Sequence, residues 1–341
     1  MPDFFKVIRS YLLEYLPNQR SYSENTIISY RQALNLLVSF LTTVKSRAVK
    51  DISFTIINKE LILDFLDWLE TERNCGAVSR NQRLMALRSF FKYAGKLDCT
   101  RIALSLEIAD IPIKREDGKV VDFLSETSLQ ALLAQPNQSK PKEMRDLFFM
   151  VLMYDTAARC SEMLDLRIRD LRVDVQHPII YLHGKWDKTR TVPLLPRTVE
   201  HYKKFLALFH KGEIHNSDKF LFYTVIHGIR HQLSADAVAL FLKKYAITAG
   251  KTCPEITKNL HPHMLRHTRS IHLYRSGMPL NLLGEFLGHS DLKSTRIYAY
   301  ADSEMKRDAI SKADAIRGNF PPPSAIWEND EQMILKLSGL S

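Results

Sequence analysis

Six polar side chains in the last two-thirds of the chain are of the types that could bind and attack a phosphodiester. They are two arginines, a lysine, two histidines and a tyrosine: Arg159, Lys185, His263, Arg266, His289 and Tyr298. Phosphoryl transfer needs charge neutralisation on the non-bridging oxygens, an aligned nucleophile and a proton for the departing oxygen. These residues could supply all three, so the predicted chemistry needs no metal ion and no cofactor.

The two arginines are the candidates for binding the phosphate. Arg159 and Arg266 would each present a planar fork of donors, which suits a phosphate and its pentacoordinate transition state. His263 and Arg266 are spaced i, i+3 in a helical pattern, so both can face one phosphate. A lone arginine is more often a structural ion-pair partner, for example Arg159 with Glu162. Only the ordered set favours catalysis.

Histidines around the second arginine raise the alternative of a metal site. His261, His263 and His267 lie close together in the sequence, but the glutamate of an HExxH pattern and a nearby carboxylate ligand are missing. Metal binding is therefore the weaker interpretation. We expect His263 to take or orient the tyrosine proton, His289 to donate to a non-bridging oxygen, and His267 to pack within its helix.

A predicted β-hairpin carries the lysine. Residues 179–185 and 189–195 are two β-rich runs joined by a polar turn. At this turn the ammonium of Lys185 could reach the DNA minor groove and protonate the 5′ oxygen as it leaves. We expect the neighbours Lys188 and Arg190 to contact the phosphate backbone instead.

Tyr298 is the candidate nucleophile. Its hydroxyl would attack the phosphorus and form a 3′-phosphotyrosyl bond, which conserves the phosphodiester energy for rejoining without ATP. Tyr300 is a rival two residues on. On a helix the two side chains point about 200° apart, so only one can face the site.

These segments resemble the boxes of the tyrosine recombinase (phage integrase) family. The first box is similar to TAARCSEMLDLRIRDL, and the second, His-x-x-Arg, to HPHMLRHT. The third is similar to LGHSDLKSTRIYAY, where His289 and Tyr298 are nine residues apart, and this spacing selects Tyr298 over Tyr300. The hairpin lysine of the family corresponds to Lys185 in GKWDKTRTVPL.

The resemblance covers nearly the whole chain, and two departures from the family pattern bear on local turn geometry. Upstream, it includes YSENTIISYRQALNLLVSFL and SRNQRLMALRSFFKYA, which are similar to the family's helical core-binding domain. Ala157 and Ala158 stand where Gly-Leu is common, and Trp186 stands where glycine often follows the lysine.

The resemblance implies a site-specific DNA recombinase, closest in layout to Xer-type and mobile-element recombinases. It implies a homo-oligomer, a tetramer that joins two double-stranded DNA sites through a Holliday junction and exchanges C-terminal segments between neighbours. Integration, excision, resolution and transposition all remain open, as do the target site and any accessory proteins.

The composition agrees with a nucleic-acid partner. The formal net charge is +10 and the pI is about 9.3, and the phosphate backbone gives basic proteins most of their non-specific affinity. The four cysteines are scattered without a CxxC pair, so we expect a reducing cytoplasm. A run of about 18 apolar residues is lacking, so we expect no membrane span.

The apolar pattern predicts a mostly α protein with a small β-hairpin or sheet, an α+β fold in two domains. Residues 1–105 read as helices throughout, with Ser23 and Asn58 as N-caps, and predict a helical, SAM-like core-binding domain that binds DNA. Residues 106–122 lack helical periodicity and predict an exposed linker.

The remainder of the chain mixes helices with the hairpin. Residues 123–318 predict the catalytic domain, and residues 319–341 a tail that begins with prolines and continues as a helix with an apolar face. This tail helix could pack on its own domain or dock on a neighbouring protomer.

A basic row marks the fourth predicted helix, which we expect to begin after Ser79. The row has no acidic residue between Ser79 and Lys96, which favours a DNA contact over an ordinary solvated face. Its members are Arg80, Arg83, Arg88, Lys92 and Lys96.

Two alternatives to a recombinase remain. A type IB topoisomerase-like enzyme would use similar chemistry as a monomer, and strand exchange between two duplexes would distinguish it. A catalytically silent, sequence-specific DNA-binding or architectural protein would need no tyrosine nine residues after His289.

Overall fold

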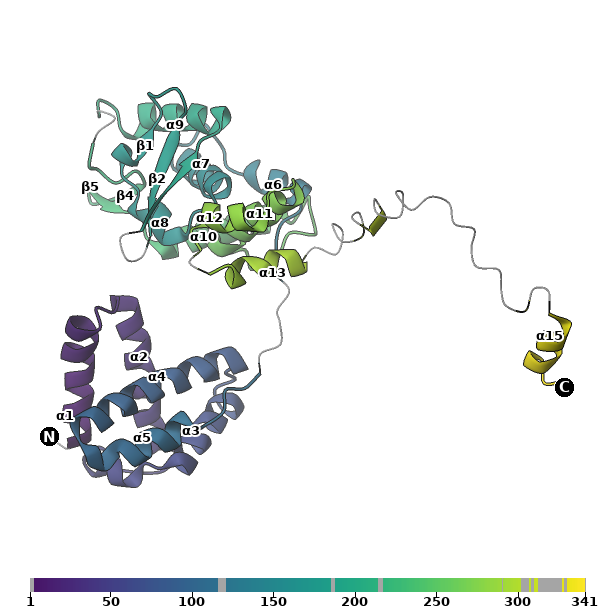
Figure 1. Ribbon diagram of the computed structural model, residues 1–341. Helices are drawn as coiled ribbons and strands as arrows, with labels where there is room; N and C mark the ends of the chain where they lie inside the picture. Colours follow the sequence, from purple (N-terminus) through teal and green to yellow (C-terminus); the bar gives the residue numbers. More distant parts are fainter. Residues whose placement is uncertain are drawn as a thin grey trace. The chain divides into compact units, whose positions relative to one another are not determined.

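The computed structural model divides the chain into two compact units, Met1–Lys119 and Val120–Ser341, here called the N-terminal and C-terminal units (Figure 1). The structure describes residues 3–115, 121–184, 188–213, 217–289 and 291–301, and beyond them 307, 310, 311, 327 and 330–340. Helices dominate both units, and short antiparallel strands occur in the C-terminal unit. The predicted fold class, mostly α with a small β-sheet, is confirmed.

The N-terminal unit is built from helices alone in its described part. They are α1 (Asp3–Ser10), the π-helix η1 (Tyr11–Gln19), α2 (Glu24–Thr43), the 3-10 helices η2 (Val49–Asp51) and η3 (Phe54–Ile56), α3 (Lys59–Thr71), α4 (Ala77–Leu97), the 3-10 helix η4 (Cys99–Arg101) and α5 (Ile102–Ala109).

Two of the predicted helix starts hold in this unit, and one shifts. The side chain of Asn58 accepts the backbone N–H of Leu61 at 2.9 Å and so caps α3. Ser23 occupies the N-cap position of α2, but its hydroxyl bonds Thr26 Oγ1 at 3.0 Å instead of a backbone N–H. Helix α4 begins at Ala77, before Ser79.

Aromatic side chains form much of the N-terminal core. Phe4, Tyr11 and Phe90 are at most 1% exposed. Phe4 of α1 meets Phe54 of η3 and Phe90 of α4 edge to face, with centroids 5.1 and 5.7 Å apart. Segments far apart in the sequence are thereby joined around α4, the helix that carries the predicted basic row.

The expectation of a linker starting at residue 106 is wrong at its first half. Helix α5 continues to Ala109, and Ile108 and Ile111 are fully buried in the N-terminal core. The chain is held as far as Lys114, whose carbonyl accepts Asn81 Nδ2 at 2.8 Å. These two isoleucines are recruited by a core that the other helices build, which local composition cannot reveal. Residues 116–120 lie outside the described part.

The C-terminal unit combines helices with a small antiparallel sheet and a second hairpin, whose strands lie toward one side of the unit (Figure 1). Its helices are α6 (Glu126–Leu133), α7 (Pro141–Thr156), α8 (Cys160–Asp165), the 3-10 helix η5 (Ile168–Asp170), α9 (Pro196–Phe209), α10 (Ala235–Ala249), α11 (Pro262–Arg275), α12 (Leu280–Leu287), α13 (Lys293–Ala301) and α15 (Glu331–Leu337). Its strands are β1 (Leu171–Arg172), β2 (Ile179–His183), β3 (Thr189–Pro193), β4 (Tyr223–Ile226) and β5 (Ile229–Gln232).

The predicted hairpin is confirmed as β2–β3, which β1 extends to an antiparallel sheet in the order β1-β2-β3. The β4–β5 hairpin was not predicted. Its two-residue turn, His227 and Gly228, has φ of 50° and 79°. Positive φ at both central positions is typical of a type I′ turn, and glycine adopts it without steric cost.

Helix α7 lies in the core of the C-terminal unit. Its residues Phe148, Phe149 and Leu152 are at most 1% exposed, and the helix packs against α9 and α11. Because α7 ends shortly before Arg159 and α11 carries Arg266, this packing sets the relation between the two candidate phosphate-binding arginines.

The tail contains the predicted helix in shorter form. Helix α15 is capped by Asp330, whose side chain accepts the N–H of Met333 at 3.0 Å. The expected tail start at residue 319 and its prolines lie outside the described residues. Among the described helices, none combines the length and the apolar content that a membrane-crossing segment needs.

Candidate active site

Arg159 stands at the N-terminus of α8, after a tight turn that leaves α7. The turn is made by Ala157, which is buried and has φ 47°, in the left-handed region. Glycine would adopt this conformation without steric cost, so the alanine marks a strained turn. Arg159 Nη1 donates to Glu162 Oε1 at 2.8 Å, and 35% of the arginine side chain stays exposed. The expected alternative, an ion pair with Glu162, is therefore present, and the guanidinium can still meet a ligand from solvent.

Arg266 of α11 is buried and joins three segments of the C-terminal unit. Its Nη1 donates to the carbonyl of Ala157 at 2.6 Å, and its Nη2 donates to the carbonyl of Leu287 at 2.7 Å. Burial, then the nearby charges of Arg159 and Arg190, lower the pKa of this guanidinium to about 10. It remains a cation at neutral pH, held between the end of α7 and the end of α12.

His289 lies directly beside this arginine. Arg266 Nη2 and His289 Nε2 are 3.1 Å apart, and a guanidinium can only donate, so Nε2 accepts. The ring proton then lies on Nδ1 and is donated to Thr295 Oγ1 at 2.9 Å. Burial, followed by the charges of Arg266 and Arg159, lowers the pKa of His289 to about 4. The ring is therefore neutral here, whereas the sequence predicts a donor to the phosphate.

Tyr298 is enclosed by apolar side chains at the junction of α11, α12 and α13. It is 1% exposed and packs with Ile271, Leu283 and Leu287. Burial raises the pKa of its phenol, although the charges of Arg266 and Arg159 act in the opposite direction. The phenol is thus protonated and within electrostatic reach of both arginines.

His267, not His263, is the hydrogen-bond partner of Tyr298. His267 Nδ1 lies 3.0 Å from the phenol oxygen, whereas His263 is exposed and its ring centroid is 5.8 Å from that of His267. Burial, then the charges of His263 and Arg266, lower the pKa of His267 to about 4, so the ring is a neutral potential base. We expected His267 only to pack in its helix and His263 to orient the tyrosine proton. In the structure it is His267 that bonds the tyrosine hydroxyl.

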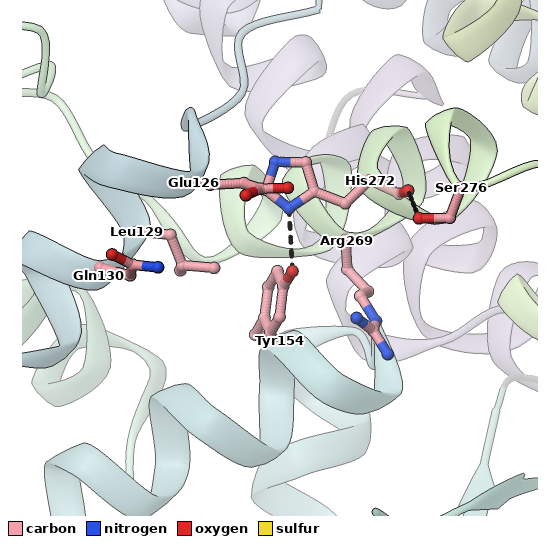
Figure 2. Close-up of a pocket in the computed structure, with 7 residues that line it drawn as sticks. All are labelled: Glu126, Leu129, Gln130, Tyr154, Arg269, His272 and Ser276. Carbon is pink, nitrogen blue, oxygen red and sulfur yellow. Dashed lines mark hydrogen bonds between the residues drawn. The ribbon is translucent and has the colours of Figure 1, made fainter.

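Helix α11 is anchored on another side by a small polar network, which Figure 2 shows around a cavity of about 270 Å³. Tyr154 of α7 and His272 Nδ1 lie 2.9 Å apart, and His272 Nε2 lies 3.1 Å from the carbonyl of Leu124, just before α6. Arg269 stacks over the Tyr154 ring at 5.0 Å. This network fixes α11 and thereby the positions of Arg266 and His267.

The hairpin lysine cannot be placed, because residues 185–187 lie outside the described part of the chain. The base of its turn is defined by Gly184 N–H, which donates to the carbonyl of Lys188 at 2.8 Å. Lys188 is exposed, as a backbone contact to DNA requires. Tyr300, the rival nucleophile, also has a side chain outside the described part.

Arg190 differs from the sequence prediction. Its side chain is 13% exposed and donates from Nη1 and Nη2 to the two carboxylate oxygens of Glu162, each at 2.8 Å. Its donors face the protein interior, so the expected contact of Arg190 with the DNA backbone is wrong. Lys188 and Arg190 are two residues apart, and such residues share a face on a strand, so alternation alone could not have indicated the burial of Arg190 or its carboxylate partner.

The predicted basic row on α4 contains both buried and exposed side chains. Arg80 is 3% exposed, donates to the carbonyl of Pro112 at 3.1 Å and lies 3.9 Å from Glu70. Arg88 is partly buried and donates to the carbonyl of Ile111. The expectation of a DNA contact is therefore wrong for Arg80. In Arg88, one guanidinium nitrogen, Nη2, is already bonded to the protein backbone.

The other three residues of the basic row differ in how far they are exposed to solvent, where DNA could contact them. Lys92 and Lys96 are exposed, and Arg83 is partly buried. Within the described residues, no group of three or more His, Cys, Asp or Glu side chains is arranged to hold a metal ion.

Comparisons with known proteins agree with this fold. Residues 122–305 match the model of the phage integrase family, and residues 9–96 match the N-terminal SAM-like domain of phage integrases. The y4rC protein of Sinorhizobium fredii (strain NBRC 101917 / NGR234), an integrase/recombinase by name, is 30% identical, over 98% of this chain and 97% of its own. Tyrosine recombinase XerD of Lacticaseibacillus casei is 28% identical over 86% of this chain and 93% of its own.

Solved structures share the fold. XerH site-specific recombinase bound to palindromic difH substrate superposes with a TM-score of 0.65 at 23% identity, covering 89% of this chain and 84% of that one. Tn1549 transposon integrase in complex with transposon right end DNA gives 0.67 at 16% identity, covering 90% and 98%.

The chain belongs to the phage integrase family, the tyrosine recombinases. It is a site-specific DNA recombinase, an enzyme that breaks and rejoins DNA strands.

Proposed function

We propose that this recombinase cleaves DNA by attack of the Tyr298 hydroxyl on a backbone phosphate held by Arg159 and Arg266. The observation that carries the proposal is the network around Arg266. This one cation contacts the turn before Arg159 and the ring of His289, and its charge reaches the phenol of Tyr298. Residues from α8, α11, the end of α12 and α13 thereby share one site.

Side chains of this protein can supply the nucleophile, the base and the acid that the reaction needs. The phenol oxygen bonds to phosphorus, the bond from phosphorus to the 5′ oxygen breaks, and a 3′-phosphotyrosyl link remains. The phenol proton passes to neutral His267, and the 5′ oxygen takes a proton from Lys185. In rejoining, a 5′ hydroxyl attacks the phosphotyrosine and both protons return.

The two arginines and His289 have distinct parts in this proposal. Arg159, with its exposed portion, meets the incoming phosphate, and Arg266 supplies a fixed positive charge behind it. A bound phosphate raises the pKa of His289, because a nearby negative charge favours the imidazolium. His289 then donates to a non-bridging oxygen, whereas it accepts from Arg266 in the present state.

The buried tyrosine implies a conformational step before cleavage. The scissile phosphorus of DNA cannot reach a phenol that is 1% exposed and bonded to His267. We therefore propose that α13 shifts when DNA binds and brings the phenol in line with the 5′ oxygen. The tyrosine is thus stored in an apolar environment, protonated and unreactive, until the substrate is present.

We further propose that the enzyme acts as a homo-tetramer on two double-stranded DNA sites, with the N-terminal unit and the exposed Lys92, Lys96 and Lys188 contacting the backbone. Solved structures of the same fold that are bound to DNA support the DNA partner in this proposal. Exposed apolar residues of α15, among them Ile334 and Leu337, suit a tail that docks on a neighbouring protomer. The cytoplasm is the proposed compartment.

The experiment compares Tyr298→Phe with Tyr300→Phe. A duplex selected from a random library by binding to the purified chain is nicked near the cleavage position, so that the cut product cannot be rejoined. Tyr298→Phe abolishes the covalent protein–DNA product while retaining affinity, because only the attacking oxygen is removed. Tyr300→Phe retains the product. Loss of the product in Tyr300→Phe alone would refute the assignment.

A second readout separates recombination from topoisomerase-like activity. Two duplexes carrying the selected site, one of them labelled, are mixed with the wild-type chain. A recombinase yields joined products with exchanged arms, whereas a type IB topoisomerase-like enzyme relaxes supercoils without exchange.

A further inference from the structure

Arg190 of β3 lies where segments that carry candidate catalytic residues meet. It is bonded through both Nη atoms to Glu162 of α8, each at 2.8 Å, and through Nε to the carbonyl of Phe286 at 3.1 Å. Glu162 is the ion-pair partner of Arg159. Phe286 belongs to the end of α12, shortly before His289.

Glu162 is a carboxylate with every acceptor position filled. It takes four hydrogen bonds of 2.8 Å, two from Arg190 and two from the backbone N–H and Nη1 of Arg159. Its side chain is only 1% exposed, so water cannot replace a lost donor. Burial raises the pKa of Glu162, but the bonds and charge of Arg190, then those of Arg159, outweigh it and hold this pKa below its usual value.

Because Arg190 and Arg159 share the carboxylate of Glu162, the bonds of Arg190 affect how strongly Arg159 is held. One negative charge lies between two guanidinium groups, and the fork of Arg190 takes one contact on each carboxylate oxygen. Without Arg190, the buried carboxylate would have Arg159 as its only cationic partner among these contacts. A buried charge that loses a partner is costly, so the guanidinium of Arg159 would be drawn inward.

A glycine packs closely against the guanidinium of Arg190. Gly288 has φ 63°, and a Cβ on it would lie 3.1 Å from Arg190 Cδ and 3.2 Å from its Nη1. Gly288 therefore permits close packing against the Arg190 side chain from the turn after α12.

We propose that Arg190 is a positioning residue, which neutralises Glu162 so that Arg159 keeps its outward donors for the scissile phosphate. The inference rests on the proposed function, in which Arg159 binds that phosphate. Arg190 itself touches neither DNA nor the reacting atoms, and its effect on cleavage passes through Arg159.

The first test measures cleavage of the nicked duplex in a single turnover by Arg190→Lys and Arg190→Gln. Both variants lose the fork that spans two carboxylate oxygens, and Lys keeps the charge. We expect cleavage to fall about 100-fold, as small misplacements of catalytic groups do, with DNA affinity nearly unchanged. We expect Arg190→Lys to fold, because it is the more conservative of the two changes.

A matched control is Arg145→Gln. Arg145 is equally an interior arginine, with Nε and Nη2 on Asp146 Oδ1 at 3.1 and 2.7 Å and Nη1 on the carbonyl of Tyr223 at 3.2 Å. None of these partners belongs to the candidate active site. We expect it to lower the melting temperature as Arg190→Gln does, without the loss of cleavage rate.

The second test asks whether the effect passes through Arg159. If it does, Arg159→Lys combined with Arg190→Gln cleaves no more slowly than Arg159→Lys alone. A duplex with an uncharged methylphosphonate at the scissile position needs less positive charge from Arg159, so the deficit of Arg190→Gln shrinks on it. A purely structural defect would be the same on both duplexes.

Three results would overturn the inference: wild-type cleavage rates in folded Arg190 variants, multiplied losses in the double variant, or an undiminished deficit on the methylphosphonate. Failure of the proposed function looks different. The wild-type chain is tested alongside, and absence of its Tyr298 adduct would overturn both proposals. An adduct in the wild type with unaffected Arg190 variants would overturn this inference alone.

Discussion

Helix α4 of the N-terminal unit and the arginine cluster of the C-terminal unit are both strongly basic, but they use their charge differently. In α4 the arginines turn inward, as Arg80 and Arg88 do to the carbonyls of Pro112 and Ile111, and the lysines stay exposed. In the C-terminal unit, Arg159 is held by a carboxylate yet keeps 35% of its side chain exposed.

The difference shows that the count of basic residues does not measure the charge available to DNA. A guanidinium can satisfy several acceptors in a fixed fork and tolerates partial burial, whereas an ammonium is strongly hydrated and stays in water. In α4 this makes arginine a structural residue and lysine the candidate contact. In the candidate active site, the buried carboxylate of Glu162 pairs with both arginines; Arg190 is 13% exposed, whereas Arg159 keeps 35% of its side chain exposed.

The largest expected effect is a loss of DNA cleavage on substitution of Arg266, which the same substitution of Arg80, another buried arginine, should not cause. Arg266→Lys replaces a fork that reaches Ala157, Leu287 and His289 and so displaces the fixed charge behind the phosphate; we expect DNA cleavage to fall about 10²–10³-fold, the order of loss seen when electrostatic stabilisation of a transition state is impaired. Single-turnover cleavage at saturating DNA measures it.

Arg80→Lys is the matched change in α4. It should lower the thermal stability of the chain while leaving the saturating cleavage rate unchanged, because Arg80 bonds only to the N-terminal unit. Equal loss of cleavage in both variants would erase the distinction between structural and catalytic arginines.

A smaller effect is expected from the exposed lysines of α4. Lys92→Ala with Lys96→Ala should weaken DNA binding and flatten the dependence of log K on log salt by up to about 2, because each lost phosphate contact removes roughly 0.9 from the slope. The control removes two other exposed cations of the same unit, Arg47 and Lys50. An identical slope change in both double variants would mean that α4 makes no specific backbone contact.

The smallest expected effect is a dependence of stability on pH. The pKa of His267 and of His289 is about 4 in the folded chain, below the usual value near 6.5. Between these pH values the unfolded chain binds more protons, so stability falls as the pH falls from about 6.5 to 4.

His267→Gln should reduce this loss. We expect the drop in melting temperature between pH 7 and pH 5 to shrink by about 2–4 °C, the shift that roughly 1 kcal/mol gives in a domain of this size. His231→Gln, a change at an exposed histidine of β5, serves as the control. A drop as large as in the wild type would show that His267 is already protonated in the folded chain.

The sequence predicts much of the fold because its signals are local. The apolar periodicity of α7 and α10, the N-cap at Asn58 and the β-rich runs of β2 and β3 are each contained in a few neighbouring residues. The turn of β4–β5 was missed because His227 and Gly228 form a weaker turn signal than Asn-Gly or Asp-Gly.

What the sequence does not predict depends on contacts between distant segments. Arg190 and Glu162 are paired across 28 positions, and Arg80 and Pro112 across 32, and no local pattern announces either pair. His267 carries a weak signal, since it is one helical turn from His263 and next to Arg266. Its bond to Tyr298 depends on how α13 packs on α11, which only the folded chain defines.

The most direct test of the account is the site of attachment in the trapped wild-type protein–DNA product. Trypsin cleaves after Arg296 and releases a peptide that begins at Ile297 and contains both Tyr298 and Tyr300, so fragmentation of this peptide must place the nucleotide. The account predicts the 3′-phosphate on Tyr298. A nucleotide on Tyr300, or on a residue outside this peptide, would contradict it.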